Sequence, residues 1–187
     1  SPTNASTAVA VAIDANEVGS ILSYDVELNT LQNIVQRELV MIMTDQDSFV
    51  KQTLLGNNLT QLCTFFGPQK VEEALLCHMF TFFNEKKDWR LRLAFFKSIV
   101  AVATYCGSQS IERQVLPFIE KCLSDGEEYV VEQTIASMTS MVELGLFRKP
   151  LVIKLVGDTA PLLYHPGIWI RHAVVVLMAV VARFLPP

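Results

Sequence analysis

The chain has 187 residues, of which 51% are hydrophobic and 18% charged, enough apolar material for a folded domain with a buried core. The net charge is -4, so the chain lacks the excess of basic residues that nucleic-acid-binding proteins carry, and the composition argues against a nucleic-acid partner. The longest apolar run, residues 173–182, is ten residues long, and a membrane-spanning helix needs roughly 20.

Residues 1–26 are rich in Ser, Thr, Ala and Asn and contain neither Lys nor Arg. This composition predicts a disordered linker ahead of the folded part. Residues 7–13 alternate in the manner of a short strand, but no second strand is predicted to pair with them.

From residue 27 onward the apolar residues recur with a helical period, and the predicted helices come in pairs separated by short polar turns. The predicted pairs are 27–44 with 47–65, 70–83 with 88–105, 110–123 with 127–144, and 149–163 with 168–184. They divide a domain over 27–187 into repeats at 27–66, 67–106, 107–146 and 147–187.

Four aromatic residues stand at a fixed interval of forty positions: Phe49, Trp89, Tyr129 and Trp169. Periods of roughly 40–47 residues are typical of HEAT and armadillo-type repeats, which are helical hairpins. The sequence therefore predicts an all-α, HEAT-like helical-hairpin solenoid of about four repeats in a right-handed stack, with a flexible N-terminal segment. We interpret the aromatic column as packing between repeats rather than as a peptide-binding ladder. On that interpretation Trp169→Ala would cost about 3–5 kcal/mol.

The turn inside each repeat carries a second column at the same interval, which is acidic in three positions of four: Asp45, Glu85, Asp125 and His165. HEAT repeats commonly combine an acidic turn with a following arginine that ties successive turns together. Arg92 follows Trp89 by three residues, whereas Arg171 follows Trp169 by two. The register slips by one, so the predicted arginine ladder is imperfect.

No pattern of residues predicts catalysis. The phosphate-binding patterns GxxxxGK[ST] and GxGxxG are absent, as are the HRD and DFG triplets of protein kinases. The three histidines have no partners at metal-ligand spacing. We therefore predict no catalytic, cofactor-binding or metal site.

The four cysteines are too widely spaced for a CxxC motif and lie in apolar helical stretches, which predicts buried structural thiols: Cys63, Cys77, Cys106 and Cys122. A run of basic residues at 86–90 could contact anionic lipid or an acidic partner, but a solvated turn is favoured. The valines at 174–176 and 180–181 are expected to face a further repeat.

Several short blocks carry a more specific resemblance. They are FFGP at 65–68, DWRLR at 88–92, LSDGEE at 123–128, LGL at 144–146, APLL at 160–163 and HPGIWIR at 165–171. In this order, over about residues 60–187, they resemble the helical-repeat region of the regulatory subunit of class III phosphoinositide 3-kinase.

The resemblance implies a larger protein with an N-terminal protein-kinase-like domain, central HEAT repeats and a C-terminal WD40 propeller, of which this chain is the middle. It implies two partners, the lipid kinase catalytic subunit and a beclin-type coiled-coil subunit. Their complex makes phosphatidylinositol 3-phosphate on endosomes and forming autophagosomes, so the implied location is cytoplasmic and peripheral on those membranes. None of the family's catalytic residues maps onto this chain.

Two alternatives remain open at this point. The chain could be a generic HEAT adaptor from another transport or phosphatase complex. It could also belong to a protein whose enzymatic serine/threonine kinase domain lies outside this segment.

Overall fold

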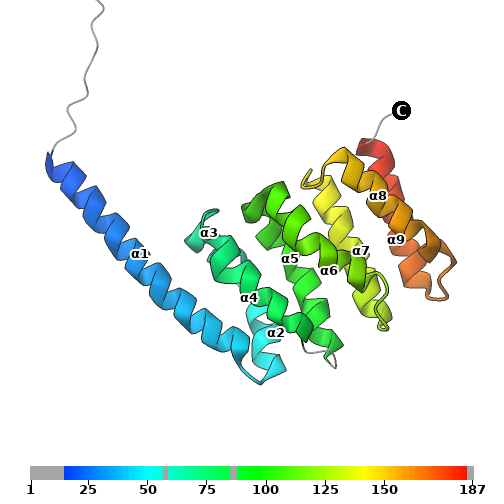
Figure 1. Cartoon of the computed structure of the whole chain (residues 1–187), viewed down its shortest axis with the longest axis horizontal. Helices are drawn as coiled ribbons and strands as arrows, with labels where there is room; N and C mark the ends of the chain where they lie inside the picture. Colours follow the sequence, from blue (N-terminus) through cyan, green and yellow to red (C-terminus); the bar gives the residue numbers. More distant parts are fainter. Residues whose placement is uncertain (1–14, 57–58, 85–87, 185–187) are drawn as a thin grey trace, which may run out of the picture. The chain divides into compact units, whose positions relative to one another are not determined.

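The structure is a computed structural model that describes residues 15–56, 59–84 and 88–184 (Figure 1). All secondary structure in these ranges is helical, so the predicted all-α class is confirmed. The chain divides into two compact units, Ser1–Arg37 and Glu38–Pro187, and each is described by itself.

The first unit contains the N-terminal part of helix α1 (Ala15–Thr44). The predicted disordered linker is therefore wrong for residues 15–26, while residues 1–14, with the strand-like alternation, lie outside the described residues. Polar side chains here bond to the helix itself: Asn29 donates to the Asp25 carbonyl at 2.9 Å and Thr30 to the Val26 carbonyl at 2.8 Å. Ser23, which lies within the predicted linker, donates its hydroxyl to Glu27 Oε1 one helical turn later at 3.2 Å.

The second unit consists of helical hairpins that begin with the last turns of α1. The remaining elements are α2 (Ser48–Gly56), α3 (Leu59–Phe66), η1 (Glu72–Leu76), α4 (Cys77–Met79), η2 (Phe80–Asn84), α5 (Trp89–Ser110), η3 (Ile111–Val115), α6 (Leu116–Cys122), α7 (Glu128–Glu143), α8 (Lys149–Thr159), η4 (Ala160–Tyr164) and α9 (Ile168–Phe184). The predicted helices coincide with these elements to within a few residues at most ends. The π-helical turns η1 and η3 were not predicted.

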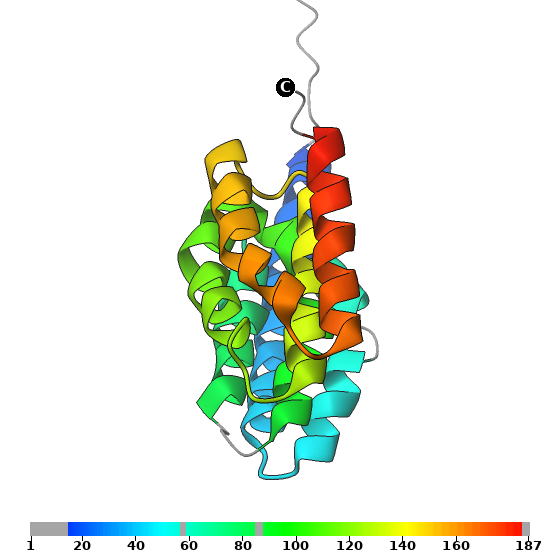
Figure 2. The same ribbon diagram turned by 90° about the vertical axis from the view of Figure 1, so that its right-hand side faces the viewer.

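The hairpins of the second unit form two layers. Helix α5 packs against α2 and α7, and α7 packs in turn against α9, so the second helices of successive hairpins form one layer. Figure 2 shows α6 and α8 on the opposite side from α7 and α9. Stacking against neighbours is how a repeat buries its apolar faces.

Phenylalanines fill the middle of the stack. Phe80 and Phe118 stack with ring centroids 4.6 Å apart, and Phe83 meets Phe95 edge-on at 4.8 Å. Phe95 and Phe96 are fully buried. These rings join the second hairpin to the first helix of the third, which is the nearest-neighbour contact on which a solenoid depends.

Glycines with positive φ end the second helices of the first three hairpins. Gly67 has φ 72°, Gly107 has φ 77° and Gly145 has φ 68°. Only glycine adopts this backbone region at little cost, and it commonly follows a helix C-terminus. The predicted joins at residues 67–68 and 107–108 therefore have a backbone cause.

The stretch Trp89–Cys122 is long and apolar enough to cross a membrane by length and composition alone. It is not one straight helix, because Gly107 at φ 77°, ψ 165° breaks it. Leu91, Phe95 and Ile99 within it are fully buried against the neighbouring helices. We therefore assign it to the core of the stack.

The valines near the C-terminus divide between two faces of α9. Val174, Val180 and Val181 are buried within the chain, whereas Val175 and Val176 are 54% and 39% exposed. The expectation that all five face a further repeat is wrong for the three buried ones, which complete the core of the last hairpin.

Candidate interaction surface

The aromatic column lies at the surface. The first turns of α2, α5, α7 and α9 follow one another along one edge of the second unit, the lower edge in Figure 1. Phe49 is 73% exposed, Tyr129 61% and Trp169 64%, while Trp89 is half-buried. The interpretation of the column as packing between repeats is confirmed for Trp89 and Tyr129, whose rings stack across neighbouring repeats, while Phe49 and Trp169 are largely exposed. A fixed interval identifies equivalent positions but does not say which face they occupy. We call this row of first turns the aromatic edge.

The turn column explains why the aromatic residues are presented alike. The Asp45 carboxylate accepts the backbone N–H of Asp47 at 2.8 Å, and Asp125 accepts that of Glu127 at 3.0 Å. His165 Nδ1 accepts the N–H of Gly167 at 3.0 Å. A side chain that bonds the backbone two residues on fixes the turn. These three turns therefore share one conformation, and the helix that follows each begins in the same way. The equivalent Glu85 lies outside the described residues.

Arg92 ties the second hairpin to the third. Its Nε donates to Asp125 Oδ2 at 2.7 Å and its Nη2 to Oδ1 at 3.0 Å. The side chains are only 13% and 11% exposed, so this bidentate pair is largely shielded from water. It is the contact that an arginine ladder of the HEAT type would make.

Arg171 acts within its own turn. Its Nη1 donates to the carbonyl oxygens of His165 at 2.7 Å and Pro166 at 2.9 Å. The one-residue slip in register thus accompanies a different role, because Arg171 stabilises the last turn whereas Arg92 joins two hairpins.

Trp89 connects the first turns of α5 and α7 on the aromatic edge. Its ring stacks on Tyr129, with centroids 5.8 Å apart and an interplanar angle of 19°. The Arg90 guanidinium carbon lies 5.0 Å from the centroid of the Trp89 ring, within cation–π range. The edge therefore presents a continuous aromatic surface from α5 to α7.

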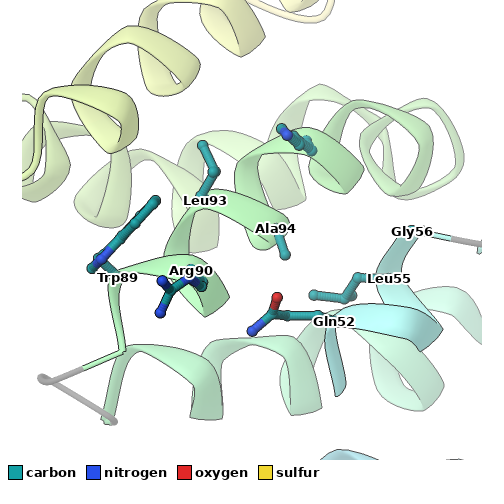
Figure 3. Close-up of a pocket in the computed structure, with 8 residues that line it drawn as sticks. Gln52, Leu55, Gly56, Trp89, Arg90, Leu93 and Ala94 are labelled. Carbon is teal, nitrogen blue, oxygen red and sulfur yellow. The ribbon is translucent and has the colours of Figure 1, made fainter. Parts of the chain in front are cut away.

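A groove of about 520 Å³ lies between α2 and α5 on one side of Trp89. Figure 3 shows Gln52 from α2 and Arg90 from α5 extending into the same space, with the Trp89 ring at one end. Lys97 also lines it. Arg90 and Lys97 are exposed, and in the described part of the chain neither forms an ion pair. We call this the basic groove.

A second groove, of about 270 Å³, lies between the start of α7 and Trp169. Its lining includes three carboxylates and two aromatic rings: Glu127, Glu128, Glu132, Tyr129 and Trp169. None of the three carboxylates has an ion-pair partner among the described residues. We call this the acidic groove.

Gly167 lets the Glu128 side chain reach the turn before α9. A Cβ on residue 167 would meet Glu128 Oε2 at 2.6 Å, which is closer than atoms can approach. The absence of a side chain at this position therefore permits the carboxylate to lie beside Trp169's helix start.

A third groove, of about 550 Å³, lies beside Phe49 and is almost wholly apolar. Its other lining residues come from the end of α1, from α2 and from α3: Leu39, Ile42, Val50, Thr53, Leu54 and Leu62. All belong to the second unit.

Carboxylates in the other layer, by contrast, are used between hairpins. Glu72 accepts from Ser110 at 2.6 Å and from Arg113 at 3.1 Å, and Glu112 and Arg148 form an ion pair. The hydrogen bond from Ser110 is the main cause that lowers the pKa of Glu72. These contacts join neighbouring hairpins. They could not be predicted from the sequence, because the two partners of each contact come from different repeats.

The cysteines occupy different environments. Cys63 and Cys122 are buried as predicted, Cys106 is half-buried and Cys77 is exposed, so the buried-thiol prediction is wrong for Cys77. Burial raises the pKa of Cys63 to about 11 and that of Cys122 to about 12, which keeps these thiols protonated and unreactive. Across the described residues no group of three His, Cys, Asp or Glu side chains could hold a metal ion.

Comparison with known proteins identifies the family. The chain matches the family model described as PIK3R4-like, middle domain, over residues 3–187. The chain belongs to this family. The resemblance to the regulatory subunit of class III phosphoinositide 3-kinase is confirmed, and this region is the non-kinase middle domain.

Relatives of the PIK3R4-like family come from distant organisms. The chain is 37% identical over 162 residues to the probable serine/threonine-protein kinase vps15 of Dictyostelium discoideum, covering 87% of this chain and 8% of that protein. It is 33% identical over 150 residues to the serine/threonine-protein kinase VPS15 of Arabidopsis thaliana, covering 80% and 10%. With vps15 of Schizosaccharomyces pombe the identity is 34% over 139 residues, covering 74% and 8%. The chain thus spans a tenth or less of each of these relatives.

Proposed function

We propose that this segment is a non-catalytic HEAT-repeat scaffold that supports assembly of a class III phosphoinositide 3-kinase complex. The observation that carries the proposal is the aromatic edge itself. It presents the exposed rings of Phe49, Tyr129 and Trp169. Among the described residues, the cations of the basic groove and the carboxylates of the acidic groove form no ion pair. Exposed rings beside such charges suit a surface that contacts other proteins.

The enzymatic part of the parent protein belongs to another region in this proposal. The relatives are named as serine/threonine protein kinases, and the chain spans a tenth or less of their length. A kinase-like domain outside this segment accounts for the name without a catalytic role here. Membership of the PIK3R4-like family favours this account over a generic adaptor.

The proposed partners are the lipid kinase catalytic subunit and a beclin-type coiled-coil subunit. The complex would produce phosphatidylinositol 3-phosphate in autophagy and endosomal sorting, with the segment cytoplasmic and reaching endosomal and autophagosomal membranes only through the complex. The basis for these partners and this location is the family resemblance.

The test is a pull-down of the full 187-residue chain against each of the two subunits separately. Binding to either subunit, weakened by charge reversal at Glu128 or Lys97 and unchanged by the matched reversal Lys121→Glu, is the expected result. Lys121 is an exposed lysine on α6, in the other layer. If the folded chain binds neither subunit, the scaffold acts only as a spacer and the assembly role is refuted.

A further inference from the structure

The basic groove continues along α5 beyond its first hollow. A second hollow of about 360 Å³ adjoins it, and the two share Lys97 of α5 and the last two residues of α2. The second hollow lies between α5 and the first turn of α3. Together the two hollows follow α5 from Trp89 to Ala101, which is about 18 Å along the helix axis. We call the two hollows together the long groove.

One face of α5 forms a wall of the long groove. Four residues of this face are four, three and four positions apart, the spacing of side chains that lie above one another on a helix: Arg90, Ala94, Lys97 and Ala101. The two cations are exposed and the two alanines are half-buried. The wall therefore presents two positive charges about 10.5 Å apart along the helix axis, with small apolar side chains between and beyond them.

The opposite wall of the long groove is neutral. It consists of Gln52 and Leu55 of α2 and of Thr60 and Gln61 of α3. In the described part of the chain, no carboxylate lines either hollow, and neither Arg90 nor Lys97 forms an ion pair elsewhere. An acidic ligand would supply the counter-charge that the groove lacks.

We propose that the long groove binds an amphipathic helix of a partner protein that carries two acidic side chains seven positions apart. The two acidic side chains meet Arg90 and Lys97, and an apolar side chain between them packs against Ala94. Two residues seven positions apart on any α-helix are about 10.5 Å apart along its axis, so the partner helix repeats the distance between the two cations.

The same distance disfavours an extended strand in the groove. Side chains on one face of a strand repeat about every 6.6 Å, so two of them do not match cations about 10.5 Å apart. Strand addition also requires the edge of a sheet, and the described residues contain only helices.

Charge complementarity favours an acidic helix over an acidic membrane. The next helix of the layer, α7, presents Glu128 and Glu132 near its start, and neither forms an ion pair among the described residues. A membrane of acidic lipids that covered both helices would be repelled by these carboxylates. A helix in the long groove lies instead on the side of α5 that faces α2 and α3.

The first arm of the test uses alanine-rich peptides of about eighteen residues, long enough to form a helix, with the full 187-residue chain. The test peptide has two glutamates seven positions apart and a leucine between them. One control has glutamine at both places, a second has its glutamates five positions apart and so on different faces, and a third has a central proline that breaks the helix.

Fluorescence anisotropy reports binding of each peptide. The test peptide should bind about fivefold or more tightly than each control, and its advantage over the glutamine peptide should shrink in high salt. Equal binding of the glutamine peptide would show that the charges are not recognised, and equal binding of the proline peptide would show that the ligand is not a helix. Either result would overturn the proposal.

The second arm uses variants of the chain whose circular dichroism is unchanged. Arg90→Glu combined with Lys97→Glu should lose the test peptide and gain a peptide with lysine in place of both glutamates. Ala94→Gln fills the groove without changing its charge and should also weaken the test peptide. Lys121→Glu is the matched control and should leave binding unaltered. Failure of the charge exchange, or displacement of the test peptide by phosphatidylserine vesicles, would overturn the proposal.

This inference rests on the proposed scaffold function only in that the segment contacts a partner at all. If the test peptide fails while the chain still pulls down a subunit of the lipid kinase complex, the acidic helix is wrong and the scaffold function stands. If the peptide binds while neither subunit does, the long groove is a docking site for another partner and the assembly role falls.

Discussion

The contact between Arg92 and Asp125 is predicted to supply much of the coupling between the second and third hairpins. Replacing Arg92 by alanine removes two charge-assisted hydrogen bonds, at 2.7 and 3.0 Å. Among the described residues, the hydrogen bond from the Glu127 N–H is the one that Asp125 then keeps. Replacing Asp125 removes the same pair and also the turn it fixes.

The magnitude follows from the burial of the pair. Removing one partner of a buried ion pair lowers the free energy of unfolding by about 3–5 kcal/mol. Because this pair keeps a small exposure to water, we expect Arg92→Ala to fall at the lower end of that range, at about 3 kcal/mol. Asp125→Ala loses about 1 kcal/mol more, since it also removes the bond that fixes the turn. Because both changes remove the same interaction, the double variant should lose about 5 kcal/mol rather than the sum of about 7, a coupling energy of about 2 kcal/mol.

Urea unfolding of the full chain, followed by circular dichroism, measures these differences. Arg183→Ala is the matched control, because Arg183 and Glu143 form a pair at 3.6 Å with side chains 70% and 50% exposed. That variant should lose less than about 0.5 kcal/mol. Additive effects of Arg92→Ala and Asp125→Ala would refute the reasoning, because they would show that the pair does not join the hairpins.

Three further predictions concern exposure, pH and thiol reactivity. Trp169→Ala should lower the free energy of unfolding by about 1–2 kcal/mol, because the Trp169 side chain is 64% exposed. The adjacent Ile170 is fully buried, so Ile170→Ala should lower it by about 3 kcal/mol. Equal losses for the two variants in urea unfolding would contradict this. The lowered pKa of Glu72 means that its contacts stabilise the fold above the ordinary pKa of 4.5 and are lost as pH falls through the folded value. Glu72→Gln should therefore reduce the drop in melting temperature on acidification, and an unchanged drop would show that the carboxylate is not so stabilised. Under native conditions Cys77 should be the first of the four cysteines to be alkylated, detected by mass spectrometry of the labelled peptides, and preferential labelling of Cys63 would contradict the structure.

Helix positions could be predicted from the sequence because they depend on local signals. The forty-residue interval, the polar turns and the glycines at residues 67 and 107 all mark boundaries by backbone requirements that act within a few residues. The beginning of α1 was not predicted, because no local signal of that kind marks it. A composition of Ser, Thr, Ala and Asn predicts disorder, but it does not reveal that the helix predicted from residue 27 extends back to Ala15.

The surface could be predicted only in part. The interval identifies Phe49, Trp89, Tyr129 and Trp169 as equivalent, but their exposure depends on how neighbouring helices pack, which no single repeat contains. The acidic groove likewise combines residues from two hairpins, so no single stretch of the sequence indicates it.

The central claim is that the aromatic edge faces the partners of the complex. Amide hydrogen exchange of the whole regulatory subunit, alone and with the lipid kinase catalytic and beclin-type subunits, tests it most directly. The amides in the first turn of a helix lack intrahelical partners, so a bound partner should slow their exchange visibly. The account predicts protection in the first turns of α5, α7 and α9 and none on α6 or α8. Protection confined to α6 and α8, or none in this segment, would contradict it.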